Sequence, residues 1–429
     1  MPLKSEAVHA HRPEDQMLCP QCDLMVALPP LSPGNRANCP RCHTTLHTAW
    51  SEPRHRPTVF AASALLMLLL ANLFPFINIH VRGLSSEISL HQIPQVMMSE
   101  NYASMAGMFI LFVQLVPAFC MVAIILLCQR VRMPQTLKVR MARLLFMLKA
   151  WSMVEIFLAG VLVSFVKLMA YGNIGVNLSF YAFVLFCLLQ VRAFQCLDRR
   201  WLWHDIAPAP VIRQAVRIGE SGLQQGLRAC PCCTAVLPAD ETLCPRCHTV
   251  GHLRKKHSLQ WTMALLITSA MLYVPANVLP IMNTELLGNA APSTIMAGVI
   301  VLWSDGDYPV ALVIFIASIM VPTLKMMAIA WLCWDARHPH RQRDSERMHL
   351  IYEVVEFVGR WSMIDVFVIA VLSSLVRIGQ LMNVYPQIAA VLFAMVVILT
   401  MIAAMTFDPR LSWDGLNRKN QKELHLDSK

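Results

Sequence analysis

The sequence predicts an all-α polytopic membrane protein built from two tandem four-helix transmembrane modules. Three observations lead to this fold class: an apolar composition, eight apolar runs of helix length, and one internal duplication. Hydrophobic residues make up 56% and charged residues 14% of the 429 residues, and the mean hydropathy is +0.51. Soluble domains carry about 25% charged residues. The composition therefore places the chain in a membrane.

The apolar runs are long enough to cross a hydrocarbon core, which takes about 20 helical residues. They form two groups of four, at 58–79, 106–128, 150–170 and 179–197, then at 259–281, 309–333, 357–377 and 384–406. The first 57 residues hold charges, prolines and cysteines but no short apolar core. We therefore expect no cleavable signal peptide before the first span.

Basic residues predict the orientation of the spans. Segments 129–149 and 335–349 are rich in lysine and arginine. The loops at the other ends of the spans contain Arg82 as their only lysine or arginine. They lie at 80–103, 171–178, 283–308 and 378–383. Because positive loops stay on the cytoplasmic side, both termini and the long middle segment are predicted to be cytoplasmic. The net charge of +10 follows from these flanking residues, which favours headgroup contacts over nucleic-acid binding.

The chain contains one internal duplication. At an offset of 205 residues, Ala71-Asn72 returns as Ala276-Asn277 and Val116-Pro117 returns as Val321-Pro322. The Trp-Ser-Met stretch at 151–153 returns at 361–363, an offset of 210. Repeat detection of this kind identifies the building unit of a fold. Each copy has an even number of spans, so the two modules are predicted to lie parallel in the membrane.

A short cysteine-bearing segment precedes each module. Two CxxC pairs occur in each segment, formed by Cys19, Cys22, Cys39 and Cys42 and by Cys230, Cys233, Cys244 and Cys247. Four thiolates at this spacing suit a tetrahedral Zn²⁺ ion, and structural disulfides are rare in a reducing compartment. We predict two structural zinc sites, each folding a small cytoplasmic zinc-ribbon-like domain whose core is too small to be stable alone.

Other assignments of these cysteines stay open. A rubredoxin-type iron site uses the same spacing, and a redox-active CxxC needs only one pair. The histidines that follow the second pairs are candidate replacement ligands, namely His43, His47, His248 and His252. Cys232 is a spare thiol in the second segment. The remaining cysteines lie in or near spans, where small buried thiols are ordinary, at Cys120, Cys128, Cys187, Cys196 and Cys333.

These signals divide the chain into five parts. We expect an N-terminal zinc ribbon at 1–57, a first four-helix module at 58–198, a linker with the second zinc ribbon at 199–257, a second four-helix module at 258–407 and a cytoplasmic tail at 408–429.

The second module carries opposite charges at membrane depth. Asp365 lies about 12 Å into its span, eight residues from the start, and Lys325 lies at a similar depth on the preceding antiparallel helix. A charged side chain at this depth costs free energy, so we expect it to pair with another polar group or to have a function. Three hydroxyl residues lie at compatible levels and complete a predicted polar network, namely Ser318, Ser362 and Thr400. A proton relay and a purely structural ion pair remain equally open.

The first module does not repeat this charge pair. Glu155 takes the place of Asp365, but Cys120 stands where a lysine would be needed. Glu155 lies nearer the cytoplasmic edge, so water or Lys149 is its expected partner. The second module is therefore predicted to be the working one, with Glu155 as a peripheral member of the network.

The outer ends of several spans have their own signals. Lys167 and Arg377 lie twelve residues beyond their acids, about 18 Å along a helix, and are predicted to anchor in the outer headgroups. Asn72 with Pro75, and Asn277 with Pro280, lie near the ends of the first and fifth spans. Proline removes a helical hydrogen bond and leaves backbone groups without their usual partners. Each Asn and Pro pair therefore marks either a hinge in the helix or the end of the helix.

These motifs resemble the bacterial paraquat-inducible protein A family from Cys19 to Asp414. The matching stretches are CPxC, CPRC, ANLFPF, LVPAFC, WSMVEIFLAGVLVSFVK, a second CPRC, PANVLPIM, VPTLKM and GRWSMIDVFVIAVLSSLVR. The resemblance implies an inner-membrane protein of Gram-negative bacteria. Its implied partner is a periplasmic protein of the MCE (mammalian cell entry) type, whose stacked rings form a tunnel for lipids. It also implies that the eight cysteines bind zinc and that Lys325 and Asp365, the charged residues within spans, are of functional interest.

The predicted function is intermembrane phospholipid transport, in which this chain loads or receives lipid for the MCE-type partner and supports envelope integrity and stress resistance. No phosphate-binding loop of the GxxxxGK[ST] type occurs, so the proton gradient is the candidate energy source. No nucleophile with its base is evident, which predicts that the protein is not an enzyme. The alternatives are a redox or stress protein that uses its CxxC cysteines and a small-molecule or ion transporter.

Overall fold

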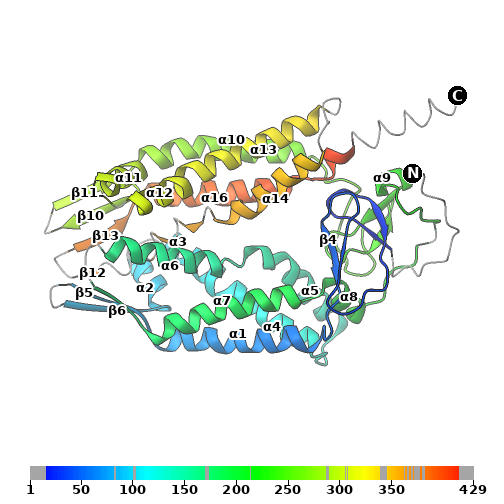
Figure 1. Ribbon diagram of the computed structural model, residues 1–429, viewed down its shortest axis with the longest axis horizontal. Coiled ribbons are helices and arrows are strands. Elements are labelled where there is room, and N and C mark those ends of the chain that lie inside the picture. Colours follow the sequence, from blue (N-terminus) through cyan, green and yellow to red (C-terminus); the bar gives the residue numbers. More distant parts are fainter. Residues whose placement is uncertain are drawn as a thin grey trace.

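The molecule is elongated, with helices running side by side along its length (Figure 1). Cysteine-bearing domains lie at one end and short strands project from the other. The computed structural model describes residues 16–81, 84–99, 103–169, 173–212, 214–286, 289–304, 306, 308–338, 345–361, 363–364, 367–368, 371, 377–378 and 382–414.

The first module is a bundle of four long helical paths. They are α1 (His55–Leu73); α3 (Ala103–Phe109) with π-helix η2 (Ile110–Leu115) and α4 (Val116–Cys128); α5 (Gln135–Leu148) with η3 (Lys149–Trp151) and α6 (Val154–Met169); and α7 (Leu178–Cys196). A short helix, α2 (Gln92–Ser99), precedes the second path. The strongest pairing is between α1 and α7, with α4 also against α1.

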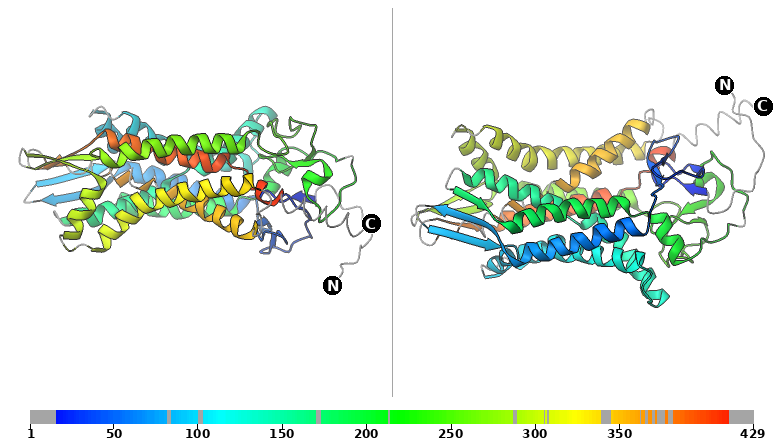
Figure 2. Two further views of the ribbon diagram at one scale, coloured as in Figure 1. Left: turned by 90° about the horizontal axis from the view of Figure 1, so that it is seen from above. Right: turned by 60° about the horizontal axis from the view of Figure 1, so that its bottom comes forward.

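The second module repeats this plan. Its helices are α10 (Ser258–Val278); α11 (Ile295–Ser304); α12 (Tyr308–Phe315) with π-helix η4 (Ile316–Met320) and α13 (Val321–Arg337); α14 (Ser345–Trp361); and α16 (Ile388–Thr406). Helices α10 and α16 pack together as α1 and α7 do. Figure 2 shows the two bundles side by side in two further views. The duplication in the sequence is therefore a duplication of structure.

The predicted membrane architecture is confirmed. Seven helical stretches in the described part of the chain are long and apolar enough to cross a membrane: His55–Leu73, Ala106–Cys128, Gln135–Phe165, Leu178–Cys196, Ser258–Val278, Ala311–Arg337 and Ile388–Asp414. They correspond to seven of the eight predicted spans. Most of the remaining span, 357–377, lies outside the described residues. The protein is a multi-pass membrane protein.

Two small antiparallel sheets add to the helical plan. In the first module the strand order is β6-β5-β7, formed by β5 (Pro75–Val81), β6 (Leu84–Ser89) and β7 (Asn173–Val176). In the second the order is β11-β10-β13-β12, formed by β10 (Met282–Leu286), β11 (Asn289–Ser293), β12 (Arg377–Ile378) and β13 (Met382–Pro386). Strand β12 lies beside β6, so the two sheets meet. The sequence predicted no strands in these regions, only loops and the ends of spans.

The strands shorten several predicted helices. Helix α1 ends at Leu73 and Pro75 opens β5, while α10 ends at Val278 before β10. Both helices thus end at the Asn and Pro positions. The Asn72 and Asn277 side-chain amides donate to the carbonyls of Leu68 and Tyr273, one turn earlier, at 2.9 and 2.8 Å. Arg377 lies in β12, so the prediction of a helix that ends there is wrong. The side-chain position of Lys167 lies outside the described residues.

Helix α6 and the described residues between 363 and 371 face each other between the modules. Helix α6 packs against the described residues between 363 and 371, and both belong to one buried cluster. The rings of Phe157 and Phe367 meet edge to face, with centroids 5.7 Å apart. A Cβ added at Gly160 would lie 3.2 Å from Phe367 Cβ and 3.4 Å from the Ile364 carbonyl oxygen. A glycine therefore allows the close approach of the two modules.

We expect Gly160→Leu to lower the free energy of unfolding by about 1–3 kcal/mol, the usual cost of overpacking a core. Thermal unfolding of the purified protein in detergent measures the change. Gly107→Leu is the matched control, because a Cβ at Gly107 would meet nothing within 4 Å. Equal shifts in the two variants would contradict close packing at Gly160.

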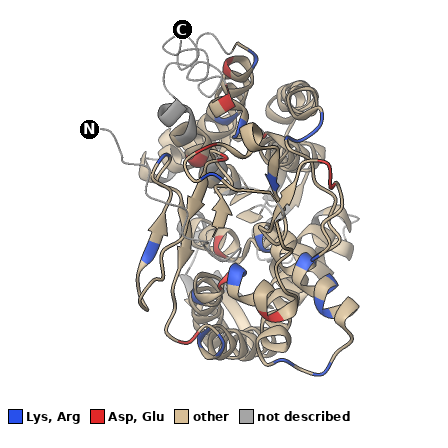
Figure 3. Ribbon diagram, turned by 90° about the vertical axis from the view of Figure 1, so that its right-hand side faces the viewer, with Lys and Arg blue, Asp and Glu red and all other residues tan. Residues whose placement is uncertain are grey.

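The cysteine-bearing end consists of short hairpins and helices. Strands β1 (Gln16–Leu18) and β2 (Met25–Ala27) form one hairpin, and β3 (Arg36–Asn38) with β4 (Thr45–Thr48) forms the next. Between the modules follow α8 (Arg199–Ile206), α9 (Gly222–Gln225) and the hairpin of β8 (Leu227–Ala229) and β9 (Val236–Pro238). Figure 3 looks onto this end, where positions of both charge signs are interspersed.

Candidate metal centres and the cavity between the modules

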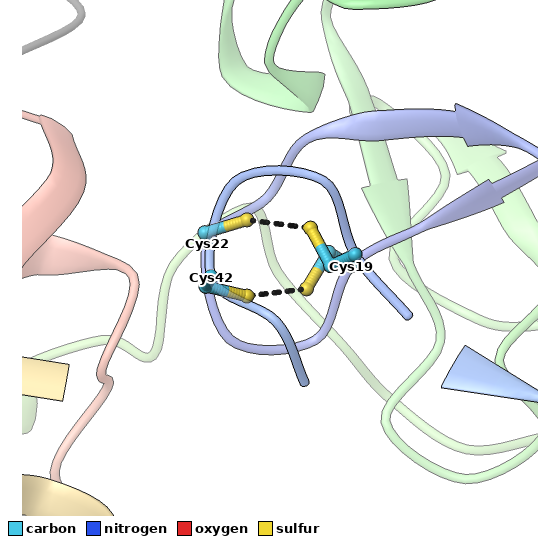
Figure 4. A group of neighbouring side chains, drawn as sticks. Cys19, Cys22 and Cys42 are labelled. Carbon is cyan, nitrogen blue, oxygen red and sulfur yellow. Dashed lines mark hydrogen bonds between the residues drawn. The ribbon is translucent and has the colours of Figure 1, made fainter. Parts of the chain in front are cut away.

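The predicted cysteines gather into two compact clusters. In each cluster the four Sγ atoms lie within 4.8 Å of one another, and all four side chains are buried. The Sγ atoms of Cys19 and Cys42 are 3.5 Å apart, and the three labelled thiols of the first cluster turn toward one centre (Figure 4). In the second cluster Cys230 and Cys247 are 3.4 Å apart. The structure thus brings together all eight predicted ligands.

All four CxxC turns have the same backbone geometry. The residue after each second cysteine has a left-handed conformation, with φ of 63°, 58°, 59° and 55° at Asp23, His43, Thr234 and His248. Its N–H donates to the carbonyl of the first cysteine at 2.8 to 3.1 Å. This turn directs both thiols of a pair to the same side, as a metal knuckle requires.

The candidate histidines stand outside the clusters. His43 and His248 occupy the turns and are exposed. His47 Nδ1 lies 3.5 Å from a carboxylate oxygen of Asp198, and His252 is half-buried. Among the described residues, the two groups with metal-ligand geometry contain cysteine alone.

The clusters fit a four-coordinate metal ion. A tetrahedral site with Zn–S bonds of about 2.3 Å places its sulfurs about 3.8 Å apart. The shortest Sγ distances here, 3.4 and 3.5 Å, need only a small expansion. Four protein ligands leave no open coordination position, which is typical of structural rather than catalytic sites. Each cluster is therefore able to bind one metal ion.

The N-terminal ribbon, which we define as residues 16–48, contacts the segments that flank the second module. Arg254 Nη2 lies 2.9 Å from Asp23 and 2.6 Å from Asp414, which flank the guanidinium. Burial raises the pKa of Asp23, and the Arg254 charge opposes this effect. The Arg41 guanidinium lies 4.6 Å from the centre of the Trp413 ring. The ribbon is thus tied to both ends of the second module's chain.

We expect Arg254→Gln to loosen the N-terminal ribbon by about 3–5 kcal/mol, because it leaves the buried Asp23 carboxylate unpaired. Limited proteolysis of the ribbon in the folded protein measures this loss. Arg217→Gln is the control, because the Arg217–Glu220 pair is exposed and such pairs contribute at most about 1 kcal/mol. Unchanged cleavage in Arg254→Gln would show that the three-residue contact does not hold the ribbon.

Lys325 is buried where three helices of the second module meet. Its side chain is 3% exposed, and Nζ donates to Thr400 Oγ1 at 3.1 Å and to the Gly359 carbonyl at 3.3 Å. A Cβ at Gly359 would come within 3.0 Å of the lysine Cε and Nζ, so glycine makes room for the lysine. Sequence reasoning missed Gly359.

The structure places part of the predicted network. Lys325 and Thr400 are in contact, and Ser318 is buried two turns earlier, in η4. Ser362 and Asp365 lie outside the described residues. The Lys325–Asp365 pair therefore remains a prediction.

A cavity of about 640 Å³ joins the two modules beside Lys325. Among the described residues, its charged lining groups are Lys325 from α13, Lys149 from η3 and Glu155 from α6. Lys149 Nζ donates to the Phe194 carbonyl at 3.1 Å and lies over the Phe194 ring. The structure thus places the acid of the first module and the lysine of the second on the same cavity.

The π-helices occur at corresponding positions in both modules. Each ends directly before the repeated Val-Pro pair, at Pro117 and Pro322. Because proline has no N–H, the regular α-helical pairing is interrupted at these points. Carbonyls of the π-helices find other donors: Phe112 accepts from the Met153 N–H at 3.4 Å and Ile319 from the Tyr273 hydroxyl at 3.2 Å. Such bulges are frequent at functional sites.

Comparisons with known proteins agree with the repeated architecture. A family model described as paraquat-inducible protein A matches residues 55–207 and 259–417, one match for each module. The intermembrane transport protein PqiA of Escherichia coli strain K12 is 67% identical over 413 residues, which cover 96% of this chain and 99% of that protein. No solved structure matches the chain.

More distant relatives match over similar lengths. The lipophilic envelope-spanning tunnel protein A of Escherichia coli strain K12 is 32% identical, with 95% of this chain and 93% of that protein covered. A probable intermembrane transport protein of Haemophilus influenzae Rd is 29% identical, with coverage of 94% and 96%. The resemblance seen in the motifs is confirmed by matches to both modules, and the chain belongs to the paraquat-inducible protein A family.

Proposed function

We propose that this chain is the inner-membrane component of an intermembrane phospholipid transport system in a Gram-negative bacterium. The observation that carries the proposal is 67% identity, over 96% of the chain, to a protein named as an intermembrane transport protein. A second relative is named as a lipophilic envelope-spanning tunnel protein. In this role the chain loads or receives lipid at the inner membrane and carries out no catalytic step of its own.

The two ends of the molecule take different roles in this proposal. The cysteine-bearing domains and both termini face the cytoplasm, which the basic loops support. The two sheets that meet at β6 and β12 then face the periplasm, at the opposite end of the molecule. They offer the partner, a periplasmic MCE-domain protein, a docking platform beyond the helices. Membrane lipids are the other partner, and nucleic acid is not one.

The cysteine clusters are proposed to bind one structural Zn²⁺ ion each. The closed four-thiolate sets and the repeated knuckle turns support this assignment. The ribbons at 1–57 and within 199–257 would then be metal-folded cytoplasmic domains that flank the modules at 58–198 and 258–407, with a cytoplasmic tail at 408–429.

The polar network of the second module is the proposed coupling element. Lys325 and Thr400 are its described centre, with Ser318 on the same helical path and Ser362, Asp365 and Glu155 as further members. A buried lysine at membrane depth is costly and is retained where it pairs or moves charge. The proton gradient is the proposed energy source, which acts by changing the charge of this network.

A reconstituted transfer assay tests the function. The purified chain in donor vesicles, with the MCE-type partner attached, should move fluorescent phospholipid to acceptor vesicles faster than the partner alone. Transfer that is unchanged by the chain would contradict the proposal. If the CxxC thiols instead cycled between oxidised and reduced states during turnover, the redox alternative would replace it.

A further inference from the structure

The two ribbons are connected crosswise to the two modules. The N-terminal ribbon precedes the first module in the chain, but its Asp23 and Arg41 contact Arg254 and Trp413, which flank the second module. The second ribbon, which we define as residues 227–250, precedes the second module. It contacts the first module and α8, the helix that follows the first module.

Two arginines bind the second ribbon to the first module. Arg143 of α5 donates to the carbonyl of Cys247. Arg199, at the start of α8, donates to the carbonyl of Cys232 at 2.7 Å. The same guanidinium lies over the Phe146 ring of α5, 5.1 Å from its centre. Hydrogen bonds from a charged donor are roughly twice as strong as neutral ones, so these contacts hold the ribbon firmly.

Equivalent arginines of the two ribbons bind equivalent segments. Arg41 and Arg246 occupy the same position in the two CPRC knuckles, 205 residues apart. Arg41 lies over Trp413, and Arg246 donates to the Ala207 carbonyl, just past α8, at 2.9 Å. Each contacted segment follows the last long helix of a module and carries the pattern Asp-x-Arg-x-x-Trp, at 198–203 and 408–413. The crosswise arrangement is therefore part of the duplication.

The two ribbons are also bound to each other. The N–H and the carbonyl of Met25 each form a 2.9 Å hydrogen bond with the segment before the second ribbon, at residues 219 and 220. Leu18 and Met25 share a buried core with Leu227 and Val236. A continuous series of contacts thus runs from the first module through both ribbons to the segments that flank the second module.

The cysteine knuckles themselves make many of these contacts. The carbonyls of Cys232 and Cys247, which accept from the arginines, belong to the knuckles of the second cluster. Asp23 directly follows Cys22, and Trp413 lies in one buried cluster with the four cysteines of the N-terminal ribbon. Small domains of this kind fold only with their metal ion. Loss of either ion should therefore break the contacts of that ribbon.

We propose that the two ribbons together form a metal-dependent connector that holds the ends of the two modules beside the cavity between them. Phe146, which Arg199 covers, lines the cavity from the first module. Met405 lines it from the second, and its carbonyl accepts from Lys255, the neighbour of Arg254, at 2.6 Å. Metal content then controls the separation of the two walls. The inference rests on the metal assignment in the proposed function and holds for any ligand of the cavity.

Hydrogen–deuterium exchange of the purified full-length chain in detergent tests the crosswise contacts, with elemental analysis of the same samples. Cys244→Ser should remove the second ion and keep the first. We expect amide exchange at 199–206 to become about tenfold faster or more, and exchange at 408–414 to change about twofold or less, because unfolding of one ribbon exposes only the segment that it covers. Cys39→Ser should remove the first ion and give the reverse pattern.

A distance measurement tests whether the ribbons hold the modules together. Spin-labelled amino acids are encoded at Arg140 of α5 and Leu350 of α14, which are both exposed, so the metal-binding cysteines stay unlabelled. Loss of either ion should shift the measured distances to longer values. Arg199→Gln keeps all eight cysteines and should give the same shift with two ions bound. Arg192→Gln, at an exposed arginine of α7, is the matched control and should give the wild-type distances.

Two results would overturn the inference. Equal changes at 199–206 and 408–414 in each cysteine variant, or changes that follow the chain order, would contradict the crosswise contacts. Unchanged distances after loss of either ion would show that the ribbons do not hold the modules together. Both results would leave two bound ions in the wild-type protein and normal lipid transfer, so they are distinguishable from failure of the proposed function.

Discussion

Cys22→Ser is expected to unfold the N-terminal ribbon and to remove one of two bound metal ions from each chain. Metal binding supplies most of the folding free energy of such small domains, about 10–16 kcal/mol in zinc-finger peptides. The ribbon hairpins are short, at three or four residues a strand, and the core around Cys19 and Cys39 consists largely of the ligands themselves. Elemental analysis of the purified protein and limited proteolysis measure the two effects.

The effect should extend to the segments that flank the second module. Asp23 follows Cys22 directly and pairs with Arg254, which lies four residues before α10 begins at Ser258. Unfolding of the ribbon would therefore release Arg254 and Asp414 together. Cys232→Ser is the matched control, because Cys232 is a buried thiol of the other ribbon that belongs to neither cluster. Two retained metal ions in Cys22→Ser would refute the ligand assignment.

Local spacing in the sequence was enough to predict the metal clusters. A CxxC pair closes its own turn, so the direction of both thiols is decided within five residues, and the structure repeats this turn four times. The spans followed from length and hydropathy in the same way. What the pattern did not contain was the neighbour of the N-terminal ribbon. Asp23, Arg254 and Asp414 are far apart in the chain, and only tertiary packing brings them together.

The strands and the cavity escaped prediction for related physical reasons. Strands β7 and β12 are only four and two residues long, too short for an alternating pattern to stand out from a loop. Counting residues along one helix estimates how deep each side chain lies in the membrane. It does not show which other helix lies beside that side chain. Glu155 was therefore assigned to water or Lys149, and its place on the same cavity as Lys325 became visible only when both modules were assembled.

Lys325→Met is expected to reduce lipid transfer by about 100-fold or more while the protein stays folded. The lysine is the buried cation at the junction of α13, α14 and α16, and methionine keeps its length without its charge. If the group relays protons, the loss matches the usual contribution of a positioned proton donor or acceptor, about 10²–10⁴-fold. The vesicle transfer assay measures the rate, and size-exclusion chromatography reports the fold. Lys256→Met, at an exposed lysine just before α10, is the control.

A second variant shows whether the charge pair drives transport or only stabilises the fold. If Lys325 and Asp365 form a pair, removing the lysine alone leaves a buried acid unpaired and costs stability, whereas replacing both by apolar residues is often neutral or stabilising. The double variant Lys325→Met, Asp365→Leu should therefore recover any lost thermal stability. If the pair drives transport, lipid transfer stays abolished in this stable protein. Normal transfer in the double variant would show that the pair only fixes the helix register. It would contradict the proposal that the pair couples proton movement to transport.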